Sequence, residues 1–288
     1  MGCSGSRTTS NNNFKYCVTV DGPEHSNFGL NKIVNENFKK GNKLYLLHIY
    51  NPKKFLEMPS EMLPENLIPA YEKKISEKLE KKDYEIIKKE KPESHVTVME
   101  SVLEIASGKN VDLLVVGAVG HKGIKKSKNL TKGLQYLVSN CKIPCLAMKH
   151  HTPLENKEIK GNNWLICIKD DNIRSFRSLE FCKKMINKQN DTIIGLHFSN
   201  EKFLADKVKS TFESRCKADG IKNKMFIVRK MDVTETLGKN ILDYLIFGQE
   251  LIEYVVVNHN IHKYKDLDKC PTVELIKYGQ HNIIFCRE

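Results

Sequence analysis

With 288 residues, the chain is long enough for two domains of ordinary size. Hydrophobic residues make up 40% of it and charged residues 28%, and these globular proportions exclude a disordered or fibrous protein. The formal net charge of +12 suits phosphate-bearing partners, although lysines placed beside glutamates on predicted helices account for part of the excess equally well. No apolar run is long enough to cross a bilayer and no secretory signal is recognised, so a cytoplasmic location is expected.

Residues 1–13 are polar and are expected to form a flexible leader. Gly2 and Ser6 fit the pattern for N-myristoylation, and Cys3 beside them is a candidate for palmitoylation. Because stable anchoring needs two such signals, the pattern predicts attachment to the cytoplasmic face of a membrane. The alternative is that a short pattern has arisen by chance in a flexible polar leader.

From residue 15 onward, short β-branched runs alternate with amphipathic stretches, which is typical of a parallel sheet with crossover helices. In the first half we expect strands at 15–21, 43–50, 84–89, 112–117 and 144–149. Between them we expect helices at 26–39, over a charged stretch that ends near Lys82, at 95–108 and at 130–140.

Residues 151–161 carry no apolar period and are interpreted as a linker, after which the same order of elements returns. The strands expected there are 163–169, 192–198, 224–230, 252–258 and 282–286, and the helices are 175–187, 201–219, 238–247 and 272–278. Continuous apolar strands must be covered on both faces. The prediction is an α/β protein with two doubly wound, five-stranded, Rossmann-like parallel-sheet units at 14–150 and 162–288, matched in the order of elements and not in residue identity.

Glycines and lysines follow the fourth strand, at the edge where such sheets bind ligands. The first strand ends at Asp21, and the fourth ends at Gly117, with Gly120 and Lys122 before a helix that begins near Leu130. Glycines after a strand let the backbone approach a phosphate, and a helix N-terminus adds positive potential. The alternative is that the glycines only close a turn and the lysines are solvated.

The blocks 112-DLLVVGAVGHKG-123 and 129-NLTKGLQYLVSNCKIPCLAMK-149 resemble the closing half of a universal stress protein domain, and 18-VTVDGPEHS-26 resembles its first strand and turn. The resemblance implies an adenine-nucleotide alpha hydrolase-like fold that binds ATP or AMP, with any magnesium carried by the nucleotide. In that family Asp21 would meet the adenosine, Ile49 would line the adenine side, and the glycines and the helix start would hold ribose and phosphates. The implied site consists of Thr19, Val20, Asp21, Ile49, Val116, Gly117, Val119, Gly120, Lys122, Thr131, Lys132 and Gly133.

The phosphate end of this motif departs from the family pattern. Thr131 and Lys132 stand where the family has Gly followed by Ser or Thr, with one extra residue in the loop before them. Thr131 adds a Cβ where the backbone should approach phosphate, whereas Lys132 could compensate as a point charge.

The second half is predicted to be a degenerate copy that binds no nucleotide, because its equivalent strand runs 255-VVVNHNIH-262 without a glycine. Asp170 and Asp171 are interpreted as turn residues, and His259 and His262 as surface histidines. Of the nine cysteines only Cys141 and Cys145 are close in sequence, and a zinc or redox role for this pair is the minor alternative to simple burial.

No catalytic triad, Walker lysine or pair of catalytic carboxylates is recognised, so no enzymatic activity is expected. The leading hypothesis is a non-catalytic protein of the stress response that binds or senses adenine nucleotides and acts through a partner surface. The alternative is a membrane-anchored interaction module that has lost nucleotide binding. In either case we expect the two units to pair as an intramolecular pseudo-dimer, with a homodimer as a further alternative, and we do not expect a nucleic acid partner.

Overall fold

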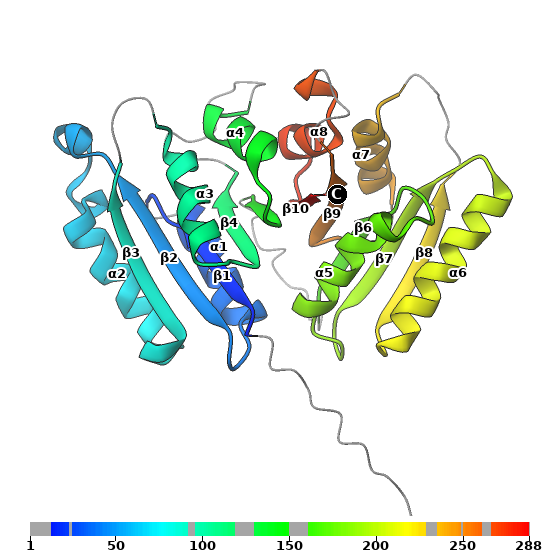
Figure 1. Cartoon of the computed structure of the whole chain (residues 1–288), viewed down its shortest axis with the longest axis horizontal. Helices are drawn as coiled ribbons and strands as arrows, with labels where there is room; N and C mark the ends of the chain where they lie inside the picture. Colours follow the sequence, from blue (N-terminus) through cyan, green and yellow to red (C-terminus); the bar gives the residue numbers. More distant parts are fainter. Residues whose placement is uncertain are drawn as a thin grey trace, which may run out of the picture.

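The structure is a computed structural model, and it describes residues 13–22, 25–91, 96–118, 130–149, 161–228, 235–248, 250–260 and 266–287. Its described strands form one ten-stranded sheet with helices on both faces (Figure 1). The strand order is β3-β2-β1-β4-β5-β10-β9-β6-β7-β8. The first half of the chain therefore supplies one side of the sheet, and the second half supplies the other.

The first half follows the predicted alternation of strands and helices closely. Its parallel strands are β1 (Lys15–Thr19), β2 (Lys43–Tyr50), β3 (Tyr84–Glu90), β4 (Leu113–Gly117) and β5 (Cys145–Met148). Its helices are α1 (His25–Lys32), α2 (Pro64–Ser76), α3 (Val98–Gly108) and α4 (Lys132–Asn140). The helix expected at 26–39 is shorter, because a π-helical turn over Ile33–Asn37 follows α1. The charged helix ends at Ser76 and not near Lys82.

The second half repeats this order. Its strands are β6 (Asn163–Cys167), β7 (Thr192–Phe198), β8 (Lys222–Val228), β9 (Tyr254–His259) and β10 (Asn282–Arg287). Its helices are α5 (Arg177–Met185), α6 (Lys202–Ala218), α7 (Leu237–Phe247) and α8 (Pro271–Tyr278). Each half therefore contributes five strands and four α-helices within the described residues.

The two halves meet through β5 and β10, which pair antiparallel with Ile284 opposite Leu146. Both predicted five-stranded units are present, and their parallel strands are joined edge to edge in one mixed sheet, a pairing that the prediction did not specify. The physical reason is that β5 and β10 are apolar strands, with all of their first four residues buried. As free edges they would expose unpaired backbone groups beside apolar side chains, and pairing them removes both edges.

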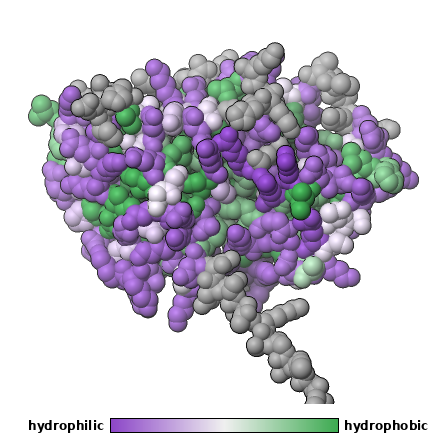
Figure 2. All heavy atoms as spheres, viewed as in Figure 1, coloured by the Kyte–Doolittle hydropathy of each residue, from purple (hydrophilic) through white to green (hydrophobic). Residues whose placement is uncertain are grey.

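The hydrophobic core lies on both faces of the sheet and continues across the joint. On one face α1, α2, α5 and α6 cover side chains from both halves, including Trp164, which stacks on Tyr254 at 4.1 Å between ring centroids. On the other face α3, α4, α7 and α8 cover a second cluster that also draws on both halves. The outer surface in the same view is mainly hydrophilic with scattered apolar residues (Figure 2). Among the described residues no helix combines the length and the apolar character needed to cross a bilayer.

The duplication extends to individual residues, which sequence comparison of the halves did not reveal. Val20 N donates to Leu47 O at 2.9 Å in the first half, and Ile168 N donates to Leu196 O at 2.9 Å in the second. The next residue of each second strand is a buried histidine, His48 and its counterpart in the second half. Its Nδ1 lies 2.7 Å from Val20 O in the first half.

The matching histidine is His197, whose Nδ1 lies 2.9 Å from Ile168 O. The expectation that the halves agree only in the order of their elements is therefore wrong. A Leu-His pair occurs at both places, but two residues in a divergent background are too few to be recognised as a repeat from sequence.

At the opposite edge of the sheet, where the strands begin, a buried side chain in each half accepts a hydrogen bond from the backbone at the start of the first strand. Asn42 Oδ1 accepts from the backbone of Phe14 at 3.2 Å in the first half. Asp191 Oδ1 accepts from Asn162 N at 2.9 Å in the second. Polar groups just before the second strand thus fix the start of the first strand in each half.

We expect Asp191→Ala to lower the free energy of unfolding by about 3 kcal/mol or more, because it leaves three donors without an acceptor. These are Asn162 N, Trp164 Nε1 and Asn187 N, all within 3.1 Å of a carboxyl that is 3% exposed. Urea unfolding followed by tryptophan fluorescence gives the measurement. Asp206→Ala, on the exposed face of α6, is the control and should change stability by less than about 0.5 kcal/mol. Equal losses of unfolding free energy in the two variants would contradict the role of Asp191 as an acceptor of three hydrogen bonds.

Candidate functional site

The candidate site lies between β1 and β4, where the strand order of the first half reverses. Val18 pairs with Val115, and Thr19 Oγ1 donates to Val115 O at 3.3 Å. The ends of the two strands are therefore side by side, which brings the predicted residues Thr19 and Val20 next to Val116 and Gly117. In doubly wound sheets this edge, beyond the carboxyl ends of the strands, is where ligands bind.

The end of β1 is held rigidly by groups from two other elements. Val20 donates to β2 through its amide, and its carbonyl receives the Nδ1 proton of His48 at 2.7 Å. Tyr71 of α2 donates its hydroxyl to Gly22 O at 2.6 Å. Burial lowers the pKa of His48 below its ordinary value, so the ring is neutral and its single proton serves this bond. The backbone that carries Asp21 is thus fixed on both sides.

Two further predicted residues lie at the same edge of the sheet. Asp21 is exposed directly after the buried end of β1. Ile49 is half-buried near the end of the neighbouring strand β2, where it packs against the cluster under α3 and α4. An exposed carboxylate and an apolar side chain therefore flank the end of β1.

The start of α4 supplies the third part of the site. Thr131 is the N-cap, and its Oγ1 accepts from Leu134 N at 3.3 Å. Lys132 is the first helical residue and is exposed. A Cβ at Gly133 would lie 3.0 Å from Met99 Cγ, so this glycine allows α4 to approach α3 closely. In the sequence, Thr131 stood out only as a departure from the family motif. Threonine is, however, a preferred N-cap residue, so its capping role could have been predicted from the sequence.

Several predicted site residues fall outside the part of the chain that the structure describes. These are Val119, Gly120 and Lys122, together with Gly2 and Cys3 of the leader and His262. Their roles stay predictions.

In the second half a side chain occupies the equivalent position. Ile166 pairs with Val256 as Val18 pairs with Val115, so Asn258 stands where the first half has Gly117. Asn258 Nδ2 donates to Ser175 O at 2.8 Å. The place where the strand order of the second half reverses, its switch point, is therefore bridged by a side chain of the protein itself.

Asp170 and Asp171 also take part in local structure. Asp170 accepts from Asn172 N at 3.0 Å and from the Ser175 hydroxyl, which is the pattern of an Asx turn. Asp171 forms an ion pair with Lys207, whose hydrogen bond lowers the pKa of the Asp171 carboxyl. The interpretation of both residues as turn residues agrees with these contacts.

His259 is not a surface residue, and that expectation is wrong. The residue is 3% exposed, with Nε2 2.7 Å from Val138 O and Nδ1 2.9 Å from Thr272 Oγ1. It therefore joins β9 and α8 of the second half to α4 of the first half. The partners are 121 and 13 residues away, and no local pattern predicts the longer contact.

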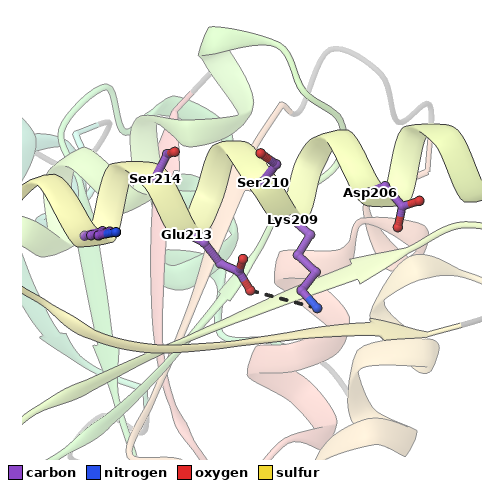
Figure 3. Close-up of a pocket in the computed structure, with 6 residues that line it drawn as sticks. Asp206, Lys209, Ser210, Glu213 and Ser214 are labelled. Atoms are coloured by element: carbon purple, nitrogen blue, oxygen red, sulfur yellow. Dashed lines mark ion pairs between the residues drawn. The ribbon is translucent and has the colours of Figure 1, made fainter.

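A hollow on the described surface lies elsewhere, along α6, with a volume of ≈ 330 Å³. Figure 3 shows Asp206, Lys209, Ser210, Glu213 and Ser214 along this one helix, with an ion pair between Lys209 and Glu213. Residues of a single helix do not converge on a ligand, so this hollow is a solvated helix face. Within the described residues no three His, Cys, Asp or Glu side chains are grouped to hold a metal ion.

The strand order with its reversal at β1 and β4, duplicated about an antiparallel joint, defines a universal stress protein fold. Residues 14–149 match the model of the universal stress protein family, and the first half of this chain is a domain of that family. The prediction of the family and of the fold class is thereby confirmed. No curated protein matches the sequence.

Solved structures extend the likeness to the whole chain. A universal stress protein from Archaeoglobus fulgidus DSM 4304 is 16% identical, with 95% of this chain and 96% of that chain covered and a TM-score of 0.61. A functionally unknown protein from Pseudomonas aeruginosa PAO1 is 10% identical over 96% and 93%, with a TM-score of 0.62. A putative universal stress protein from Pseudomonas aeruginosa UCBPP-PA14 is 12% identical over 96% and 94%, with a TM-score of 0.60. At these identities the likeness shows the fold alone.

The neutral state of His48 predicts a pH dependence of stability. Because its pKa is lowered in the folded chain, the unfolded chain binds more protons below about pH 6.5, and the free energy of unfolding falls as the pH drops. His48→Leu removes this contribution. We expect the wild type to be more stable than the variant by about 1–3 kcal/mol near neutral pH, and this gap should narrow toward about pH 5. Urea unfolding at both pH values tests it, and a constant or widening gap would exclude a neutral, bonded His48.

Proposed function

We propose that the first half of the chain binds ATP or AMP at the edge between β1 and β4 and acts as a non-catalytic nucleotide sensor. The observation that carries the proposal is the contrast between the two switch points. In the first half, β4 ends in a glycine beside a rigidly held strand end, whereas in the second half Asn258 crosses to Ser175 O at 2.8 Å. A ligand site is maintained in one copy and is closed by protein in the other.

Each described part of the site fits one portion of an adenine nucleotide. Asp21 is an exposed acceptor for ribose hydroxyls or the adenine amino group, and Ile49 offers apolar contact to the base. Gly117 leaves room for backbone approach, as glycines do where a ligand lies against the chain. At α4 the first amides have no partner within the helix and carry the positive end of its dipole, which suits phosphate.

Thr131 and Lys132 alter this phosphate end without removing it. The Thr131 hydroxyl accepts from Leu134 N and so uses one of the helix-terminal donors. Lys132, exposed at the first helical position, adds a full positive charge in return. We therefore propose that nucleotide binding survives the departure from the family motif, with Lys132 as a phosphate contact.

The proposal includes no chemical step. The histidine beneath the site, His48, is 2% exposed and its Nδ1 proton is engaged by Val20 O. A buried neutral imidazole in that position supports the strand end and does not reach a substrate as a base. The bound nucleotide is proposed to act by ordering the site for a partner.

Titration calorimetry with ATP and with AMP tests the proposal. We expect binding by the wild type at sub-millimolar concentration, and a Kd raised about tenfold, or about 1.4 kcal/mol, by Asp21→Asn or Lys132→Ala. Both side chains are exposed, so the variants should fold as the wild type does. Asp170→Asn, in the turn of the second half, is the matched control and should bind as tightly as the wild type. Absence of heat with both nucleotides at about millimolar concentration would overturn the proposal.

A membrane-anchored module without nucleotide binding is the second candidate. Its support is the joint of the two halves, where β5 and β10 pair antiparallel within one chain, as the proposed intramolecular pseudo-dimer would require. Residue 13, where the described part of the chain begins, leads directly into β1 at the edge opposite the candidate site.

For this candidate we expect Gly2→Ala to move the protein from the membrane fraction to the supernatant, because myristoylation requires glycine at that position. Cys3→Ser should give partial release, since one acyl chain binds only marginally. Fractionation of cells that express each variant provides the readout, and Ser4→Ala is the control. If the wild-type protein is already found in the supernatant, the membrane-anchor hypothesis is excluded.

A further inference from the structure

The two outer strands of the ten-stranded sheet, β3 and β8, differ in how their free edges are protected. Within the described residues each is bonded to a single strand, β3 to β2 and β8 to β7. Lys88 lies opposite His48 in the first half and Ile227 lies opposite His197 in the second, so Lys88 and Ile227 occupy corresponding positions. The last three residues of β3 are charged, whereas residues 225–228 of β8 are all apolar.

The alternation of backbone hydrogen bonds leaves every second residue of β8 facing away from the sheet. Val228 O accepts from Ser199 N at 3.1 Å, so the even-numbered residues of β8 bond toward β7. The amide and the carbonyl of one strand residue point to the same side. Asn223, Met225 and Ile227 therefore each direct a donor and an acceptor outward, and an open apolar edge of this kind is a template for another strand.

Large apolar side chains are exposed beside this edge on both faces of the sheet. Ile227 is 38% exposed, and Phe203, at the start of the helix α6 that packs on β8, is 82% exposed. Phe247, which ends α7 on the other face, is 81% exposed. Glu250, three residues later, binds Lys224 at 2.7 Å and so places the end of α7 near the beginning of β8. Apolar atoms are visible at this end of the molecule, on the right of Figure 2.

We propose that β8 pairs antiparallel with β8 of a second copy of this chain, about a two-fold axis at Met225. In that register Met225 faces its own copy, and Asn223 faces Ile227 of the other chain. These are the residues whose backbone groups point outward, so each donor on one strand meets an acceptor on the other. The chain already closes two apolar edges by antiparallel pairing, at β5 and β10. The nucleotide site takes no part in this contact.

The charges at this edge favour a second copy as the occupant. The two-fold register sets Lys224 opposite Phe226 of the other chain. It sets Lys222 opposite Val228, so like charges do not face each other. Val228 bonds to the turn before α6, and that turn carries the exposed carboxylate of Glu201. A cation at the start of each strand therefore approaches an anion near the end of the other, and the symmetry repeats the contact.

Sedimentation of the full chain over a range of concentrations tests the proposal. We expect a species of 33.1 kDa to give way to one of twice that mass as the concentration rises. Ile227→Lys gives β8 the side chain that β3 carries at the corresponding position, and it should raise the dimer dissociation constant about tenfold or more. Leu56→Lys, the same kind of change at a fully exposed apolar residue of the first half, is the control and should leave that constant unchanged.

Hydrogen exchange gives a readout that needs no substitution. The amides of Asn223, Met225 and Ile227 should exchange about tenfold or more slowly at concentrations where the dimer predominates than where the monomer does. The outward amide of Lys88 on β3 should exchange at the same rate in both. The proposal is overturned if the chain is a monomer at every concentration, if Ile227→Lys dimerises as tightly as the wild type, or if protection increases on β3 and not on β8.

Discussion

The antiparallel pairing of β5 with β10 is the contact on which the rest of the molecule depends. Each strand would otherwise be the apolar outer edge of a five-stranded sheet, with backbone groups open to water or to another chain. Once paired, they make one sheet on which both core clusters continue from half to half. Polar contacts then fix the angle of the joint, as Lys32 of α1 meets Glu253 before β9 at 3.0 Å and Tyr254 reaches Asn37 at 3.4 Å. The two halves therefore stabilise one another and do not behave as independent domains.

The two halves share the buried framework beneath the proposed ligand site, but their residues at the sheet edge differ. The buried histidines, and the hydrogen bonds between the first and second strands, are the same in both halves. The residues at the sheet edge are not, since Lys169 stands in the place of Asp21 and the first residue of α8 is Pro271 where α4 has Lys132. An acidic side chain, a bare strand end and a cationic helix start have all been replaced. All three differences fall at residues that the proposed nucleotide would contact, whereas the shared buried residues are ones whose removal would cost stability.

How far the sequence predicts this structure depends on the range of the interaction. Apolar runs define the strands to within about two residues, because burial on both faces of a sheet leaves a strong local signal. The place of Thr19, Val20 and Gly117 at one edge follows from strand order alone. The joint could not be predicted, since β5 and β10 are separated by more than 130 residues and nothing local specifies their pairing. The burial of His259 could not be predicted for the same reason, because its environment consists of α4 and α8, whereas its neighbours in sequence indicate only a strand end.

The contact of His259 with Val138 gives the second half a function that does not require a ligand of its own. In the proposed nucleotide complex the first amides of α4 would face phosphate, and this helix of nine residues would have to be held in position. Its C-terminal half is held from the second half by the 2.7 Å bond to His259, while its N-terminal half packs on α3 through Gly133. The second half, whose own switch point is bridged by Asn258, can still hold α4 of the first half in position. Together with the pairing of β5 and β10, the contact of His259 with Val138 makes the joint the place where the two halves hold each other in position.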